Sequence, residues 1–355
     1  MTAGSRIGGA PACILHADPP DAQRPAFVDA TVLPGRGMML LQSRLRLPSG
    51  EISDALAAPD LDAAARLLDG GAEDVAGNRS FSFGGAILAP FANRIRGRAI
   101  ENARAIDTLV AGRPARLPRN WGGRAPGAEQ YAMHGLLLNA RARLHRVGAS
   151  SVEGRLDLGE RDGWPGALRF DVVWALEAGG LSLTITATNT GSAATPVGVG
   201  WHPYFRVASG ERARARLRLA ARTRVRVNNY DEVLPTGDLE PVADGPYDFA
   251  GPQGRALGET YLDDCFTDLI REDGLPLAEL RDEAAGLGLR LFSSSREIRA
   301  LQVFAPPEKP FVVIEPQFNL ADPYGPQWGG RDTGMVLLPA GGEATYRVRV
   351  EPFAL

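Results

Sequence analysis

The sequence has few cysteines, almost no lysine and no long apolar run. The first and last of these shortages argue against a disulfide-rich protein and a membrane-spanning one. Its 355 residues contain two cysteines, Cys13 and Cys265, which are too few for a disulfide framework in a chain of this length. Lys309 is the only lysine, so arginine carries nearly all of the positive charge. No stretch reaches about 18 consecutive apolar residues, which predicts no membrane-spanning helix. The N-terminus shows no basic start followed by an apolar run, so we predict no signal peptide and a cytoplasmic protein.

The balance of charge argues against nucleic acid as a partner. The formal net charge is −3 and the isoelectric point is about 5.9, whereas domains that bind nucleic acid carry a basic excess. The densest basic stretch, residues 212–226, alternates arginine with small or apolar residues. Alternation with a period of two is typical of strands with one face in water. We therefore predict a solvated strand face there and no site for a polyanion.

Motifs for the common cofactors are also missing. The sequence contains no GxGxxG, no P-loop, no HExxH and no CxxC. Nothing in the motif content therefore points to a nucleotide cofactor or a zinc site, and we expect no cofactor and no metal.

Turn-forming residues and alternating patterns predict an all-β protein. The 42 glycines and 27 prolines favour many short strands over a helix bundle. Residues 168–176 and 181–187 alternate apolar and polar side chains on either side of a Gly-Gly turn, which predicts a hairpin. Further strands are predicted near residues 38–46, 287–292, 299–305, 311–315 and 344–350, and one short helix within 57–70.

The chain is expected to divide into an N-terminal arm and one large domain. Residues 1–28 are rich in Ala, Pro, Gly and Asp without periodicity, which predicts a loose arm. Residues 29–355 show no internal repeat with a period of roughly 20 to 50 residues. We predict that they form a single large antiparallel β domain.

Several reactive side chains stand where a strand protein has little use for them. His134 and His202 are two of only four histidines, and both stand beside glycine or aromatic residues. Glu315 follows the apolar run 311–314 and precedes a proline, and a carboxylate at the tip of a buried strand is costly unless it is paired or functional. The alternatives are a strand-end charge that reaches water for Glu315 and core packing for each histidine. Cys265 lacks any nucleophile signature, so we expect it to be buried.

Seven segments, from about Gly84 to the C-terminus, resemble the aldose 1-epimerase (galactose mutarotase) family. A single segment such as HG is a weak signal, but chance does not readily place seven in the family's order. Over the first 80 residues the resemblance is weak. The segments are NRI (93–95), HG (134–135), RDGWPG (161–166), VGVGWHPYF (197–205), LPTGDLEPV with a following DF (234–249), LDDCF (262–266) and IEPQFNLADPYG (314–325).

This resemblance implies a fold and a set of roles. Members of the family form a large twisted antiparallel β-sandwich, sometimes called a supersandwich, with the site in a groove across one sheet. By resemblance, Glu315 is the general base and His202 is the general acid. The positions that correspond to the family's sugar-binding residues are Asn93, Arg94, His134 and Asp263. Asp263 is preferred to the adjacent Asp264 because it stands three residues before Phe266, as the family's aspartate does.

The implied activity is the interconversion of the α and β anomers of a free aldose such as glucose or galactose. One proton leaves the anomeric hydroxyl while the ring oxygen gains one, so one acceptor and one donor across the sugar suffice. An ionised Glu315 would accept the proton, and nearby carboxylates are expected to raise the pKa of His202 and keep it charged. The chemistry requires no cofactor or metal. The expected partner is a small-molecule sugar, and the expected protein is a monomer or homodimer.

Two other kinds of function fit the same residues. One is a non-catalytic sugar-binding protein of the same fold. The other is an enzyme acting on a modified sugar such as a hexose phosphate, for which Arg96 and Arg98 could supply additional cations. Asp263 and Glu315 could formally serve glycoside cleavage as well, since two carboxylates are the requirement for that reaction.

Overall fold

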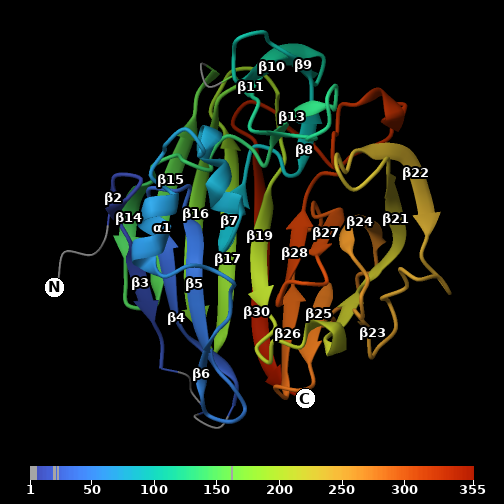
Figure 1. Ribbon diagram of the computed structural model, residues 1–355. Helices are drawn as coiled ribbons and strands as arrows, with labels where there is room; N and C mark the ends of the chain where they lie inside the picture. The colour runs from blue at the N-terminus through green and yellow to red at the C-terminus, as the bar shows by residue number, and fades with distance from the viewer. Residues whose placement is uncertain (1–5, 19–20, 22–23, 161–162) are drawn as a thin grey trace.

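The computed structural model of the protein describes residues 6–18, 21, 24–160 and 163–355. Regular structure in these residues is mostly β-strand, arranged chiefly in two large antiparallel sheets (Figure 1). The predicted all-β class is therefore confirmed. Each of the predicted strand positions is occupied by a strand, and the predicted helix is α1 (Leu61–Leu67), whose first turn is capped by the Asp60 carboxylate.

The larger sheet, sheet I, combines strands from the N-terminal part of the chain with strands from its C-terminal half. Its order is β22 (Pro235–Pro241), β21 (Ala221–Val227), β24 (Leu262–Leu269), β27 (Ala300–Ala305), β28 (Phe311–Gln317), β19 (Gly200–Arg206), β7 (Gly85–Leu88), β5 (Met39–Arg46), β4 (Ala26–Leu33) and β3 (Cys13–His16), with β6 (Ile52–Asp54) paired to β5.

The second sheet, sheet II, is built around the predicted hairpin. Its order is β14 (Arg143–Val147), β15 (Ser151–Leu158), β16 (Leu168–Glu177), β17 (Gly180–Asn189), β30 (Glu343–Ala354), β26 (Leu287–Phe292), β25 (Ala278–Asp282), β20 (Arg216–Leu219) and β23 (Arg255–Ala256). The hairpin of β16 and β17 turns at Ala178 and Gly179, which both have positive φ, as a two-residue hairpin turn requires.

Smaller sheets and short turns complete the described structure. The small sheets are β1 (Arg6–Ile7) with β2 (Ala10–Pro11), β9 (Arg98–Ala99) with β10 (Ala105–Val110) and β11 (Arg113–Pro118), β12 (Trp121–Gly122) with β13 (Gln130–Met133) and β8 (Arg94–Arg96), and β18 (Thr195–Val197) with β29 (Val336–Leu338). The 3-10 turns are Val75–Phe81, Arg212–Arg214 and Pro326–Trp328. Strands β8 to β11 and β13 lie together at one end of the two large sheets, at the top of Figure 1.

The two large sheets pack face to face through apolar and aromatic side chains. Trp174 of β16 and Trp201 of β19 meet with ring centroids 5.5 Å apart, and both rings are fully buried. Across the same interior the Tyr346 hydroxyl of β30 donates a hydrogen bond to the Pro316 carbonyl of β28 at 2.9 Å. Because one apolar face of each sheet is covered by the other, the architecture is the predicted antiparallel β-sandwich.

The N-terminal segment differs from the loose arm that its composition predicts. Cys13–His16 forms β3 and pairs with β4, with Cys13 and Leu15 turned into the core. Four alternating residues are too short a pattern to stand out in a segment rich in glycine and proline, which is why the sequence did not reveal them. A boundary at residue 28 would cut β4. Residues 1–5, 19–20 and 22–23 of the arm, and Arg161 and Asp162 of the RDGWPG segment, lie outside the described residues.

Two arginines of the basic stretch, Arg212 and Arg224, are not on a solvated face, and the Arg224 side chain is 11% exposed and pairs with Asp264 and Glu240. Arg222 and Arg226 of β21 are exposed, as predicted. Arg212, in contrast, is buried, and its guanidinium donates hydrogen bonds to the carbonyls of Gly258, Thr260 and Ala305. It precedes the strand and ties a turn together, so the period of two does not apply to it.

No helix in the described part of the chain has the length and apolar content needed to cross a membrane.

Burial on the hairpin gives a direct test of the sandwich. Leu183 of β17 is 1% exposed, whereas Leu109 of β10 is 57% exposed. We predict that Leu183→Ala lowers the free energy of unfolding by about 2–5 kcal/mol, because it removes buried contacts and leaves a cavity. The same substitution at Leu109 should change it by less than about 0.5 kcal/mol. Urea unfolding followed by circular dichroism measures both, and equal costs for the two variants would contradict the packing described.

Candidate active site

Strand alternation places a row of polar side chains on the face of sheet I that points away from the sandwich interior. On β28, Val312 and Ile314 join the main core, so Glu315 and Gln317 turn to the other face. The same parity on β19 turns Trp201 into the core and His202 outward.

The register of the strands aligns these side chains. Gln302 of β27 pairs with Glu315 of β28 on one side and with Cys265 of β24 on the other. The pairs Gly200–Gln317 and Tyr204–Val313 bracket the position at which His202 faces Glu315. Since neighbouring strands lie about 4.7–4.9 Å apart, these residues form one contiguous polar patch on four adjacent strands.

A second group of side chains reaches this patch from the small sheet of β8 and β13. Met133 of β13 pairs with Arg94 of β8. His134 directly follows Met133 and Asn93 directly precedes Arg94, so both lie at the same end of this strand pair. The His134 amide donates to the Asn93 carbonyl at 2.9 Å, and the Asn93 amide donates to Nδ1 of His134 at 3.3 Å. Both residues have a φ of 62°, a conformation that costs non-glycine residues energy and is concentrated at functional sites.

A closed hydrogen-bond network joins the two groups. The Gln302 amide donates to Asp263 Oδ1 at 2.7 Å and its oxygen accepts from Asn93 at 3.0 Å. The Arg94 guanidinium donates to Asn93 Oδ1 at 2.6 Å and lies 3.7 Å from Asp263 Oδ2. Each member fixes the rotamer of the next, so the network is rigid.

The structure distinguishes the two adjacent aspartates. Asp263 turns to the same face as Cys265 and faces Arg94. Asp264 turns to the opposite face, where Arg224 and the Tyr230 hydroxyl hold its carboxylate. Cys265 is buried, as predicted, and burial raises the pKa of its thiol, which disfavours a thiolate nucleophile.

Glu315 and His202 form the centre of the patch. Nε2 of His202 lies 3.4 Å from Oε1 of Glu315, and both side chains are nearly inaccessible, with 6% and 2% of their side-chain surfaces exposed. Gln317 donates to the other oxygen, Oε2 of Glu315, at 2.8 Å. The His134 ring stands nearly perpendicular to the His202 ring with centroids 5.0 Å apart, and Phe81 packs on His134 at 4.8 Å.

Several buried polar atoms in this patch have no partner among the described residues. They are Nε of Arg94, Nε2 of His134, Nδ1 of His202 and Oε1 of Gln317. Buried polar groups in proteins are nearly always hydrogen-bonded, and such orphans are concentrated here around one spot. The spot therefore presents unmet donors and acceptors to a ligand that carries several hydroxyl groups.

All six residues singled out from the sequence, Asn93, Arg94, His134, His202, Asp263 and Glu315, are thus brought together at this spot. Comparison with protein families bears on the same segments. The family model described as aldose 1-epimerase matches residues 56–350. The chain belongs to the aldose 1-epimerase family. The match begins earlier than the resemblance seen by motif, which started near Gly84.

Solved structures show the same fold at low sequence identity. A galactose mutarotase-like protein from Clostridium acetobutylicum has a TM-score of 0.72 and 18% identity over 93% of each chain. A GalM/aldose epimerase homologue from C. elegans has a TM-score of 0.72 and 18% identity, covering 97% of this chain and 99% of its own. A galactose mutarotase-like protein from Lactobacillus casei has a TM-score of 0.66 and 17% identity, covering 96% and 99%. The galactose mutarotase-like fold is therefore shown.

A curated relative matches a shorter part of the chain. Uncharacterized protein YihR of Escherichia coli K12 is 33% identical over 121 residues, which is 34% of this chain. The matched region spans only 35% of the length of that relative.

The electrostatics of this aldose 1-epimerase family site differ in one respect from the expectation. Nearby carboxylates were expected to raise the pKa of His202 and keep it charged, but burial dominates and lowers that pKa from 6.5 to about 3. Burial likewise raises the pKa of Glu315 well above 4.5, and the hydrogen bond from Gln317 only partly opposes this. In the empty site, burial therefore disfavours the charged form of both groups.

His134, His202 and Glu315 each also bring a potential metal-ligand atom within 4.8 Å of the others. A histidine ligates a metal through an unprotonated ring nitrogen. Because Nδ1 of His134 accepts the Asn93 amide, the neutral ring carries its proton on Nε2 and is a donor there. The trio therefore suits a ligand with hydroxyl groups better than a metal ion.

Sequence reasoning missed Gln302, Gln317 and Phe81. Gln302 stands alone between Leu301 and Val303 in a predicted strand, and an outward polar residue at that position is ordinary on a solvated face. Only the register, which sets Gln302 beside Glu315, identifies it.

Gly135 sets the backbone of this site and gives a test of it. Its φ is +87°, and a Cβ atom there would lie 2.1 Å from the carbonyl oxygen of Ala89. Gly112 has a similar φ of +76° with nothing within 4 Å of an added Cβ. We predict that Gly112→Ala costs about 1–2 kcal/mol of unfolding free energy from backbone strain alone, and that Gly135→Ala costs at least about 2 kcal/mol more because of the clash. Chemical denaturation of both variants measures this, and equal losses would contradict the close approach.

Proposed function

We propose that this protein is an isomerase that interconverts the α and β anomers of a free aldose. The observation that carries the proposal is the buried contact of Glu315 with His202 at 3.4 Å, beside buried polar atoms that have no hydrogen-bond partner among the described residues. Membership in the aldose 1-epimerase family supports an isomerase that acts on sugars. We propose that its ligand is a small-molecule sugar and that the protein is located in the cytoplasm.

The reaction needs only the movement of two protons. Glu315, in the ionised state of the pair, removes the proton from the anomeric hydroxyl, and His202 gives a proton to the ring oxygen as the bond from the anomeric carbon to that oxygen breaks. The open-chain aldehyde rotates about its first carbon–carbon bond and closes on the other face, and each proton returns by the reverse transfer. After opening, the pair is neutral, which is the form that burial favours.

The remaining residues are proposed to hold the sugar. Nε2 of His134 and Nε of Arg94 donate to sugar hydroxyls, because both atoms are buried without a partner. Asp263 accepts from a hydroxyl on the opposite side, where Gln302 and Arg94 fix its carboxylate. Asn93 acts through Arg94, whose guanidinium it orients. A ring held on both sides exposes its anomeric carbon to one acid–base pair.

The cations suggested for a phosphorylated substrate are already engaged elsewhere. Arg96 donates to the Asp322 carboxylate and to Gln327, and Arg98 pairs with Asp107. The site therefore favours a free aldose over a hexose phosphate.

Removal of either member of the pair tests the assignment. We predict that Glu315→Gln and His202→Asn each lower the catalysed rate of glucose or galactose mutarotation by about 10²–10⁴-fold, because each removes one proton-transfer group. Polarimetry on freshly dissolved α-glucose and α-galactose measures the rate.

The matched controls are Glu153→Gln and His145→Asn, which alter side chains away from the patch and should keep the wild-type rate. Circular dichroism shows whether each variant is folded. Sugar binding by the wild type without any anomer exchange would instead indicate a binding protein.

The lowered pKa of His202 predicts an unusual pH dependence. Because the pKa of His202 is about 3, its imidazole is not protonated as the pH falls through 6.5, and the protonation of the pair does not change there through His202. We predict that kcat/KM, corrected for spontaneous mutarotation, shows no decline between about pH 8 and pH 5 and falls only at more acid pH. A fall centred on the ordinary histidine value of 6.5 would contradict the burial argument.

A further inference from the structure

A large cavity lies away from the Glu315 and His202 pair, on the outer face of sheet II. Its volume is about 1040 Å³, which is ample for a drug-sized or metabolite-sized ligand. Ser182 and Thr184 of β17 form part of its floor, because Leu181 and Leu183 on the same strand turn into the core. The segments 267–277 and 292–299 form the opposite wall. None of the six candidate active-site residues lines it.

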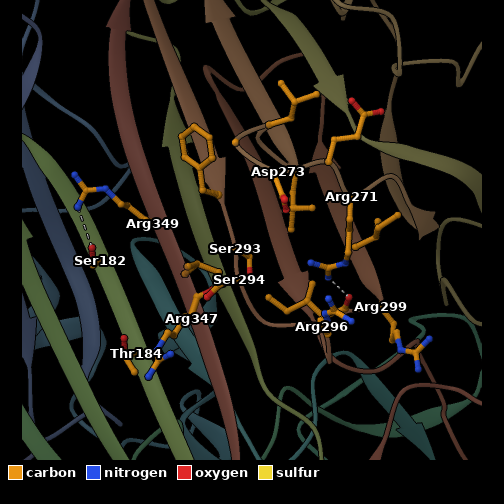
Figure 2. A pocket seen from close by; sticks show the side chains of 18 of the residues that line it. Ser182, Thr184, Arg271, Asp273, Ser293, Ser294, Arg296, Arg299, Arg347 and Arg349 are labelled. Atoms are coloured by element: carbon orange, nitrogen blue, oxygen red, sulfur yellow. Dashed lines mark hydrogen bonds between the residues drawn. The ribbon is translucent and has the colours of Figure 1, made fainter.

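Arginine dominates this cavity. Figure 2 shows Arg271, Arg296 and Arg299 gathered on one side and Arg347 and Arg349 on the other, across Ser293 and Ser294. Five arginines line one cavity in a chain whose net charge is −3. This concentration is the opposite of what the overall composition would provide.

These arginines are only partly neutralised by the protein itself. Arg349 pairs with Glu351 and donates to Ser182, and Arg299 pairs with Asp332. Arg296 and Arg347 have no hydrogen bond or ion pair from their side chains among the described residues.

Within the described part of the chain, the Arg271 guanidinium has a hydrogen-bond partner, unlike those of Arg296 and Arg347. It donates to the Ile298 carbonyl at 2.6 Å, and among the described residues it forms no ion pair, although the charge of Glu297 acts on it. Burial, and next the charge of Arg299, lower its pKa, so the positive charges on this side repel one another.

The cavity also offers groups that suit hydroxyls. Asp268, Glu272 and Asp273 line the same wall, and carboxylates accept hydrogen bonds from hydroxyl groups. Ser293, Ser294 and Thr184 add side chains that both donate and accept. The combination of unpaired guanidinium groups with carboxylates and hydroxyls matches a ligand that is anionic at one end and polyhydroxylated at the other. Guanidinium groups bind phosphate oxygens in a bidentate manner, which makes phosphate the best matched anion.

We propose that this cavity is a second ligand site, separate from the catalytic patch, which binds a small phosphorylated polyhydroxy compound of the sugar phosphate type. Arg296 and Arg347 contact the phosphate from opposite sides, and the carboxylates of Asp268, Glu272 and Asp273 receive the hydroxyl groups. The site is independent of the mutarotation chemistry, since it shares no residue with the Glu315 and His202 pair.

Isothermal titration calorimetry with glucose 6-phosphate, inorganic phosphate and glucose tests the proposal. The test variant is Arg296→Ala combined with Arg347→Ala, both of which alter exposed side chains. The control variant is Arg141→Ala combined with Arg143→Ala, which removes the same charge from exposed positions outside the cavity. Thermal unfolding shows whether the variants are folded, and mutarotation of free glucose should be unchanged in both.

We expect glucose 6-phosphate to bind the wild type, the control variant and Glu315→Gln alike, and to bind the test variant about tenfold or more weakly. Comparison of glucose 6-phosphate with inorganic phosphate shows whether the sugar moiety adds affinity, as the carboxylates of Asp268, Glu272 and Asp273 predict. Equal affinity of the test and control variants, or no binding of either phosphate to the wild type at about 10 mM, would overturn the proposal. Loss of binding in Glu315→Gln would place the phosphate in the catalytic patch and would overturn it as well.

Discussion

The whole site depends on one physical constraint, which is the removal of two ionisable side chains from water. Glu315 and His202 are nearly inaccessible and in contact, so neither can hold a charge without cost unless the other compensates. Desolvation pushes both toward their neutral forms. Two adjacent groups that can exchange a proton, one a carboxyl and the other an imidazole, are suited to a reaction in which protons are moved and then returned. In water the carboxyl group would be ionised at neutral pH and the imidazole would titrate near pH 6.5.

The rest of the structure serves to hold that pair in place. The alternation of β19 and β28 is what sends His202 and Glu315 to the same face, while their neighbours Trp201 and Ile314 anchor the strands in the core. The loops around Asn93 and His134 add backbone strain, which the surrounding hydrogen bonds offset. No single polar residue on these strands would mark a site by itself. The strand register brings them together on one face, and this forms the site.

Much of the fold and part of the site could be predicted from sequence, for identifiable reasons. The hairpin of β16 and β17 follows from unbroken alternation over residues 168–176 and 181–187, and Glu315 stands out because it ends an apolar strand. The preference for Asp263 over Asp264 rested on spacing, and the structure turns Asp263 toward Arg94. Gln302 could not be found, because its importance lies in a partner strand and not in its own neighbours. The neutral state of His202 could not be found either, since it depends on burial, and the short strand β3 was concealed by its composition.

The order of strands in sheet I also determines at what point in synthesis the sheet can be completed. Strand β28 lies between β27 and β19, so β19, which pairs with β7 on one side, gains its second neighbour only after the chain beyond residue 311 has been made. Until then β19 has an open edge, and such edges are the places at which incomplete chains pair with one another. A chain that stops before β28 therefore contains His202 but lacks Glu315, and its β19 keeps an unpaired edge at which such chains can associate.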